Sequence, residues 1–216
     1  MKEHMFGVET FIGGYYIDTD LCDKIKLYFD NNIKYASSGT VTLNTDRNHV
    51  NKKMKDSLDL SLLSNKKLAQ DYGLELNKVL KKYQNKFKFV KKINTSSIKE
   101  DLKIQYYKKS AGYKTWHFER AGLFNTTRSL VFMTYLNNVP KGGTEFYYQK
   151  ITAPAKKGLT LIWPTDWTHT HRGQITKQYS KYIVTGWLNF NYWQFHNKCY
   201  IKFIKTYEFN KLLLVF

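Results

Sequence analysis

Apolar residues recur at helical spacing in two segments of the first hundred residues, and both segments are predicted to be helices. In the first segment the apolar positions are Leu21, Ile25, Tyr28 and Phe29. Asp20, with Asp23 three residues later, is expected to cap the N-terminus of this helix. In the second segment, from about residue 64 to 83, the apolar positions are Leu76, Val79, Leu80 and Tyr83. The N-terminal part of the chain is therefore predicted to be rich in helix.

After about residue 100 the pattern changes to short apolar or alternating runs separated by turns. The predicted strands lie at 102–106, 130–136, 145–149, 159–163 and 181–190. Lys156, Lys157 and Gly158 are expected to form a turn between two of them. Several short strands at this spacing are typical of an all-β barrel or sandwich. The fold is therefore expected to be mainly β with flanking helices.

The length of 216 residues suits a single domain. We divide it into an N-terminal helical and strand support region (1–100), a core (101–190) and a C-terminal extension (191–216). No apolar run is long enough to predict a membrane span, and the N-terminus has no secretory pattern, so a cytoplasmic location is expected, in the host cell if the source is a virus. Cys22 and Cys199 have no paired spacing that would predict a disulfide or a zinc site.

The chain is strongly basic, with 35 Lys and Arg against 17 Asp and Glu, a net charge of +18. Such a charge raises the possibility of a nucleic-acid partner. However, only the residues at 47, 120, 128 and 172 are Arg, the cation favoured for bidentate contacts to phosphates and bases. The charge therefore suggests a partner class without assigning a function.

Histidines and a carboxylate recur at strand spacing in the second half of the chain. His117 and Glu119 are two residues apart, and so are His169 and His171. In a strand, residues two apart face the same side. Two His and one carboxylate form the facial set that holds non-haem Fe(II) and leaves coordination positions open. Such pairs also occur by chance, and either downstream histidine satisfies the pattern.

The spacing of further residues makes the pattern more specific. Lys181 lies ten residues after His171, and Trp187 lies six residues after Lys181. Tyr107 lies ten residues before His117. Between these groups, Arg128 and Tyr135 are seven residues apart and are followed by Gly142 and Gly143. This ordered set, over roughly residues 102–190, resembles the 2-oxoglutarate- and Fe(II)-dependent dioxygenases. The resemblance is to their prolyl-4-hydroxylase-like branch, which includes the collagen-type and oxygen-sensing prolyl hydroxylases and small stand-alone microbial and phage members. It implies a double-stranded β-helix, a cupin-like jelly-roll, with the N-terminal helices packed on it.

The resemblance also implies a role for each matched position. His117, Glu119 and His171 would bind Fe(II), since the Lys at plus ten fits His171 and not His169. Lys181 would pair with the distal carboxylate of 2-oxoglutarate, and Tyr135, Tyr107 and Trp187 would line the same site. Tyr106 and Tyr113 are close rivals of Tyr107. The expected residues at the substrate entrance are Arg128, Trp116 and Trp167, although a structural ion pair is the preferred interpretation of Arg128. Packing in the core is an equal interpretation of Trp187.

The implied reaction is hydroxylation of an unactivated C–H with release of succinate and CO2. Its cofactors would be Fe(II), 2-oxoglutarate and O2, with ascorbate as reductant. The expected substrate is a prolyl or other side chain of a peptide or protein, or a small molecule. One departure is that the family usually has Asp where this chain has Glu119. Glu is also a ligand in related dioxygenases, but the departure raises the alternative of a jelly-roll binding protein with impaired catalysis.

A second alternative is a dioxygenase that acts on nucleic acids. Such enzymes generally carry Arg after the distal His, where this chain has Lys181. We therefore expect neither a specific nucleic-acid partner nor a membrane partner, and the oligomeric state is left open.

Overall fold

The computed structural model describes residues 1–42, 48–93 and 97–190 of the chain. The predicted C-terminal extension (191–216), including Cys199, lies outside the described residues. Within the described residues, Cys22 is a free, buried thiol, and no helix is long and apolar enough to cross a membrane.

Two antiparallel sheets form most of the molecule, which confirms the predicted mainly β fold with flanking helices. The larger sheet has the strand order β1 (Glu3–His4), β2 (Gly13–Tyr16), β11 (Leu159–Pro164), β8 (Arg128–Tyr135), β13 (Lys181–Asn189), β7 (Lys103–Tyr107), β6 (Leu58–Ser61) and β3 (Ser37–Ser38). The smaller sheet has the order β10 (Ile151–Ala155), β9 (Val139–Phe146) and β12 (His171–Gly173). A short hairpin pairs β4 (Val41–Thr42) with β5 (Asn48–His49).

The predicted strand at 145–149 is misplaced. β9 runs from Val139 to Phe146, and residues 147–150 form the turn into β10, in which Lys150 has a positive φ of 54°. The Pro-Lys-Gly-Gly segment at 140–143, which resembles a turn in sequence, therefore lies inside a strand. That strand is held on both sides, since β9 pairs with β10 and with β12, so partners distant in sequence outweigh its local turn preference.

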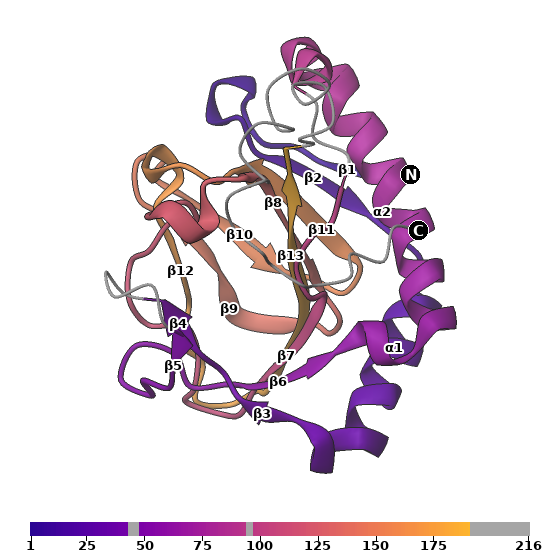
Figure 1. Ribbon diagram of the computed structural model, residues 1–216, viewed down its shortest axis with the longest axis vertical. Helices are drawn as coiled ribbons and strands as arrows, with labels where there is room; N and C mark the ends of the chain where they lie inside the picture. Colours follow the sequence, from indigo (N-terminus) through magenta and orange to yellow (C-terminus); the bar gives the residue numbers. More distant parts are fainter. Residues whose placement is uncertain (43–47, 94–96, 191–216) are drawn as a thin grey trace, which may run out of the picture.

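Two α-helices cover one face of the larger sheet, and the smaller sheet lies on the other side (Figure 1). They are α1 (Thr19–Asn32) and α2 (Lys66–Lys86), and both predictions of a helix are confirmed. The predicted cap of α1 is wrong: Asp18 is the N-cap, and its side chain accepts the N–H of Asp20 at 2.9 Å. Asp20 lies inside the first turn, where its carboxylate faces the positive end of the helix dipole.

Short 3-10 helices connect these elements. They are η1 (Val8–Thr10), η2 (Ile33–Tyr35), η3 (Leu62–Ser64), η4 (Lys88–Lys92), η5 (Leu123–Asn125) and η6 (Trp167–His169).

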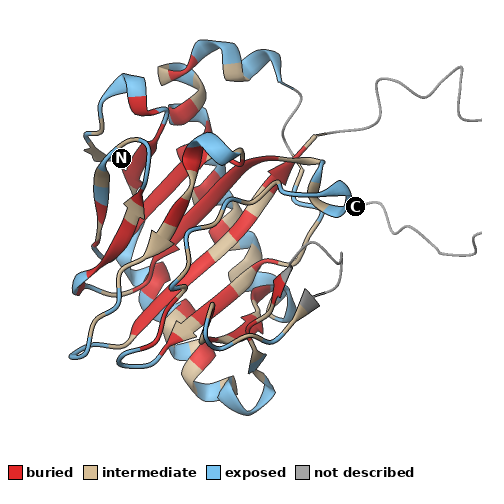
Figure 2. Cartoon of the chain, turned by 90° about the vertical axis from the view of Figure 1, so that its left-hand side faces the viewer, coloured by how far each residue is buried: buried red, intermediate tan, exposed pale blue. Residues whose placement is uncertain are grey.

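Alternation along the central strands divides the buried residues between two cores. On β8, Leu130 and Phe132 belong to the core under the helices, whereas Val131, Met133 and Tyr135 belong to the core that faces the smaller sheet. Because both faces are covered, this strand is buried from residue 129 to 135. Figure 2 shows the buried residues continuing along these strands.

The alternation has one interruption that affects the site. Leu188 of β13 pairs with Leu130 of β8, but Asn189 pairs with Arg128, so Ser129 is an extra residue on β8. A bulge of this kind reverses which face the next residue points to. Arg128 therefore points to the face opposite that of Leu130, toward the smaller sheet.

Candidate functional site

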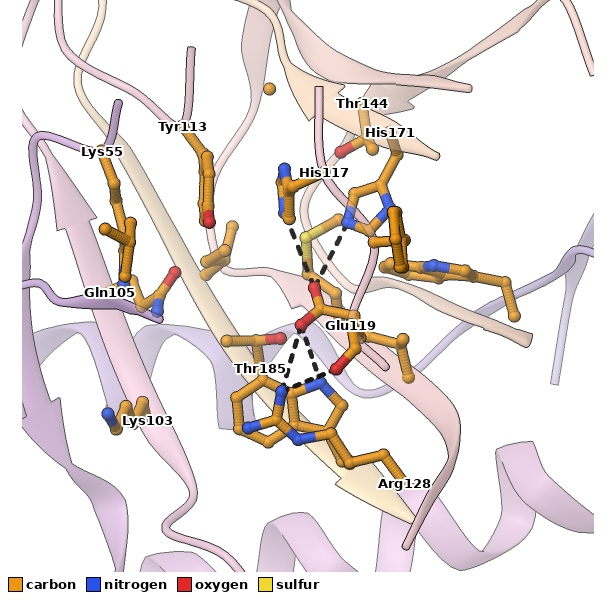
Figure 3. Close-up of a pocket in the computed structure, with 18 of the residues that line it drawn as sticks. Lys55, Lys103, Gln105, Tyr113, His117, Glu119, Arg128, Thr144, His171 and Thr185 are labelled. Atoms are coloured by element: carbon orange, nitrogen blue, oxygen red, sulfur yellow. Dashed lines mark hydrogen bonds and ion pairs between the residues drawn. The ribbon is translucent and has the colours of Figure 1, made fainter. Parts of the chain in front are cut away.

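A cavity of about 400 Å³ opens between the two sheets. Its inner wall includes residues of β7, β8, β9, β12 and β13, and the segment 117–119 crosses it. The lining also includes Lys55, Glu100, Asp101, Lys103 and Asn125. The cavity therefore brings together residues that are far apart in sequence, as Figure 3 shows for the labelled side chains.

Three of the predicted residues converge inside this cavity. The Nε2 atoms of His117 and His171 lie 3.6 Å and 3.4 Å from Oε1 of Glu119. One ligand atom from each of these residues lies within 4.8 Å of the other two. The group could thus hold a metal ion, and among the described residues it is the one cluster of this kind.

Backbone contacts position these side chains. His117 and His171 exchange two backbone hydrogen bonds, from N of each to O of the other, at 3.0 Å and 2.9 Å. The N–H of Glu119 donates to the carbonyl of Thr165 at 3.1 Å. The bridge between positions 117 and 171 brings the first imidazole onto the end of β12, which the local pattern of residues 117–119 does not predict.

Both imidazoles are oriented by a carbonyl two residues earlier. Nδ1 of His117 bonds to O of Thr115 at 3.0 Å, and Nδ1 of His171 bonds to O of His169 at 2.9 Å. Because a carbonyl only accepts hydrogen bonds, each Nδ1 carries the proton and each Nε2 presents a lone pair to the cavity. Such a partner on the other ring nitrogen is the usual arrangement for a metal-binding histidine.

The rival histidine has a different environment. His169 is buried, and its Nε2 lies 3.0 Å from the carbonyl oxygen of Thr10 while its Nδ1 lies 3.0 Å from Oγ1 of Thr168. Both ring nitrogens are thus used outside the cavity. The structure brings His171 to Glu119, and not His169.

Burial and charge set the protonation of the cluster. Burial, followed by the nearby His171, lowers the pKa of His117. Burial alone would raise the pKa of Glu119, but when the two imidazoles are also protonated at Nε2, their hydrogen bonds and charges outweigh it and hold that pKa well below its usual range. A deprotonated carboxylate and a neutral imidazole are the forms that bind a divalent metal.

Lys181 is a buried cation in the lining of the same cavity. Its side chain is 5% exposed, and Nζ donates to the carbonyl of Gly142 at 2.8 Å. No carboxylate within the described part of the chain forms an ion pair with it. Burial lowers its pKa to about 8. Because an unpaired buried charge is costly, this lysine is a candidate anchor for an anionic ligand.

The tyrosines separate by strand alternation. Tyr135 and Tyr107 line the cavity from β8 and β7, with their hydroxyls bonded to Thr144 Oγ1 at 2.6 Å and Gln105 Oε1 at 2.7 Å. Tyr106 points to the opposite face of β7, where it packs against the rings of Phe29 and Tyr182. Tyr113 also lines the cavity, and its ring stacks on that of His117 at 3.5 Å.

The three expected entrance residues lie in different places. Arg128 lines the cavity and forms an ion pair with Glu100 at 2.5 Å. Trp116 and Trp167 do not line it; they are 38% and 59% exposed. They belong to a surface row of aromatic rings with Tyr147 and Tyr148, in which neighbouring rings meet edge to face. The sequence pattern does not predict this separation because the side of a loop residue depends on tertiary packing.

Several cavity residues were not predicted. Thr144 bonds to Tyr135, Glu100 pairs with Arg128, and Lys103 and Gln105 share the cavity face of β7 with Tyr107. The last two carry a usable signal, because they precede Tyr107 by four and two residues in one strand. Lys55 is buried beside them in an ion pair with Asp59 at 2.8 Å, a contact that sequence does not reveal.

Comparisons with known proteins agree with this geometry. Residues 102–189 match the 2OG-Fe(II) oxygenase superfamily. No curated protein matches the sequence.

The fold is similar to a prolyl-4-hydroxylase of Pseudomonas putida, with a TM-score of 0.63 at 10% identity over 83% of this chain and 92% of the other. It is similar to a Trichoplax adhaerens prolyl hydroxylase in complex with a hypoxia inducible factor peptide fragment, with a TM-score of 0.65 at 10% identity over 83% and 84%.

A third similar structure is the collagen prolyl hydroxylase of Paramecium Bursaria Chlorella virus-1 in its 2OG complex. Its TM-score is 0.59 at 14% identity, over 84% of this chain and 97% of the other. At these identities the likeness establishes the fold, a double-stranded β-helix, as the sequence resemblance implies.

Proposed function

We propose that this chain is a 2OG-Fe(II) oxygenase, the superfamily that residues 102–189 match, and that it hydroxylates a prolyl or other side chain of a peptide or protein. The observation that carries the proposal is the convergence of His117, Glu119 and His171 in one cavity with the buried, unpaired Lys181. The products besides the hydroxylated substrate would be succinate and CO2.

The donor set fits Fe(II). Two imidazoles with free Nε2 lone pairs and one carboxylate are the protein ligands of the facial triad, which leaves the remaining positions open. Bound Fe(II) and 2-oxoglutarate would supply the oxidation of the C–H bond by O2. The protein's own contribution is to hold these groups in a fixed orientation inside the cavity.

In this proposal Lys181 and Tyr135 act on the cosubstrate through charge and a hydrogen bond. Lys181 would bind the distal carboxylate of 2-oxoglutarate through Nζ, because a charge-assisted contact offsets the cost of burying the cation. Tyr135, whose hydroxyl lies 2.6 Å from Thr144, is placed to donate to the same carboxylate. Burial raises the pKa of Tyr135, so this hydroxyl stays protonated as a donor at neutral pH.

The peptide substrate is supported by two observations. The Trichoplax adhaerens structure is a complex with a peptide fragment, and in this chain the cavity lining includes charged side chains from loops and from β7, among them Glu100, Asp101 and Lys103. A lining of this kind suits a polar substrate rather than an apolar one.

The proposal is tested by measuring succinate release from 2-oxoglutarate with Fe(II) and ascorbate. We expect turnover in the wild type, and loss by at least about 100-fold in His117→Ala and Lys181→Ala, because each removes a ligand or the anion anchor. A Trp167→Ala control, on the surface outside the cavity, should keep wild-type turnover. Equal turnover in all four proteins would refute the assignment.

A jelly-roll binding protein is tested separately, by calorimetry with Mn(II) and N-oxalylglycine, an inert cosubstrate mimic. Binding of the pair without any succinate release, over a panel of proline-containing peptides, would favour that alternative. Binding together with turnover supports the hydroxylase.

A further inference from the structure

The two oxygens of the Glu119 carboxylate have different partners. Oε1 faces the two imidazoles, whereas Oε2 accepts a hydrogen bond from Nε1 of Trp187 at 3.1 Å and lies 3.6 Å from Nη1 of Arg128. Figure 3 shows Arg128 on the side of the carboxylate away from His117 and His171. Oε1 is thus directed at the imidazole nitrogens, whereas Oε2 is held by Trp187 and Arg128 on the opposite side of the carboxylate.

Arg128 is itself held in place. Its Nε and Nη2 donate to the two carboxylate oxygens of Glu100 at 2.8 Å and 2.5 Å, and Nη1 donates to the backbone carbonyl of Glu119 at 3.0 Å. Its guanidinium carbon lies 3.6 Å from the centre of the Trp187 ring. A forked ion pair combined with stacking on an aromatic ring leaves the guanidinium little freedom.

The fold places these two side chains beside Glu119 by separate means. Trp187 is six residues after Lys181 on β13, so the even spacing puts both on the cavity face. Arg128 reaches the same face because of the β8 bulge at Ser129. Asn189, opposite the bulge, also bonds to Glu100 Oε1 at 3.3 Å and to Thr127 Oγ1 at 3.0 Å.

We propose that Trp187 and Arg128 are positioning residues that make Glu119 competent in a site where the family usually has Asp. A glutamate has one more rotatable bond than an aspartate, and the freedom of that bond must be lost when the carboxylate binds a metal. Trp187 and Arg128 remove that freedom in advance by fixing Oε2, so that Oε1 stays within 3.6 Å of both imidazole nitrogens. Their action is on Glu119, in place of the cosubstrate and entrance roles that the sequence resemblance implies for them.

This inference rests on the proposed metal centre, and it is tested by Mn(II) affinity, which needs no turnover. Trp187→Phe removes the indole N–H together with the five-membered ring, and keeps an aromatic ring at this position. We expect it to weaken Mn(II) binding about tenfold, as loss of a partner of a metal ligand does, in an electron paramagnetic resonance titration. Arg128→Lys keeps the positive charge but loses the two parallel hydrogen bonds to Glu100, and it should also weaken Mn(II) binding.

The decisive comparison is the same substitution in a Glu119→Asp background. The shorter carboxylate cannot reach both the imidazoles and Trp187, so there Trp187→Phe should change Mn(II) affinity less than about twofold. Trp167→Phe, outside the cavity, is the matched control, and thermal melting checks that every variant is folded.

Three outcomes would contradict the proposals, and they differ. An equal loss of Mn(II) affinity in the wild-type and Glu119→Asp backgrounds would show that Trp187 acts through general packing. Unchanged affinity in folded Trp187→Phe and Arg128→Lys would refute the positioning role. Failure of the wild type to bind Mn(II) would refute the proposed metal centre itself.

Discussion

Burial lowers the pKa of Lys181 to about 8, and this makes its charge sensitive to pH near neutrality. The neighbouring cavity tyrosines do not share this sensitivity, because burial raises the pKa of Tyr107 and of Tyr113. Lys181 therefore differs from most lysines, whose charge is constant below about pH 9. In the proposed function the cosubstrate dianion would stabilise the charged form.

At this scale we predict that anion binding weakens as pH rises. Above about pH 8 the unliganded protein loses the Lys181 charge, so affinity for N-oxalylglycine with Mn(II) should fall by up to about tenfold per pH unit between about pH 8 and 9. Lys181→Arg should flatten this dependence, because Arg stays charged. Calorimetry at about pH 7, 8 and 9 measures both; an identical decline in the Arg variant would contradict the prediction.

The same pKa has a consequence for stability. Because the folded-state pKa is lower than that of the unfolded chain, the unfolded state binds more protons between about pH 8 and about pH 10.4. Lys181 alone therefore makes the free energy of unfolding increase with pH across that window. Below about pH 8 the cost of burying its charge is present in full.

Among the structural elements, β9 shows how the smaller sheet constrains the site. It carries Thr144, the partner of Tyr135, and Gly142, whose carbonyl accepts from Lys181. Gly143 lies between them, and a Cβ there would be 2.1 Å from the carbonyl oxygen of Ala153 on β10. Glycine is therefore required for the close approach of the two strands.

We predict opposite effects for two Gly→Ala substitutions. Gly143→Ala should lower the free energy of unfolding by about 1–3 kcal/mol, as other overpacked sites do, and should also weaken N-oxalylglycine binding. Gly73→Ala, in α2 with nothing within 4 Å of the new Cβ, should raise stability by about 0.5–1 kcal/mol. Urea unfolding measures both, and a stable Gly143→Ala protein with normal binding would contradict the role given to β9.

For the molecule as a whole, the two sheets and a loop segment must come together before any site exists. Residues from β7, β8 and β13 of the larger sheet meet residues from β9 and β12 of the smaller one. The N-terminal strands β2 and β6 extend the larger sheet by pairing with β11 and β7. The division of the chain at residues 100 and 190 stays a prediction.

The net charge of +18 also belongs to this scale. Among the cations, Lys181 is the one that we propose binds an anionic ligand through its charge. Most of the remaining positive charge should therefore act as a general property of the surface. We predict salt-dependent retention on heparin without sequence preference. Lys181→Ala should elute within a few per cent of the wild-type salt concentration, whereas a large shift would indicate that the cavity is the polyanion site.

The sequence by itself determined the elements and the spacing of the chemistry. Helical and alternating periodicities predicted α1, α2 and most central strands, because burial of one face imposes a period on the chain. Even spacing within a strand also placed Lys181 and Trp187 on one face, and could have separated Tyr107 from Tyr106. The choice of His171 over His169 followed from the family resemblance, which expects the lysine ten residues after the distal histidine, and the structure brings His171 to Glu119.

Only the tertiary structure decided contacts between segments that local sequence does not connect. Strand register decides three of these contacts. It sets the bridge between His117 and His171. It also sets the bulge at Ser129, which turns Arg128 toward the cavity and its ion pair with Glu100. Trp116 and Trp167 lie on the surface for the same reason, since loop residues follow the packing of the elements that they join. Periodicity fixes the face of a residue within one strand, whereas register between strands, which is set by the whole core, fixes its neighbours.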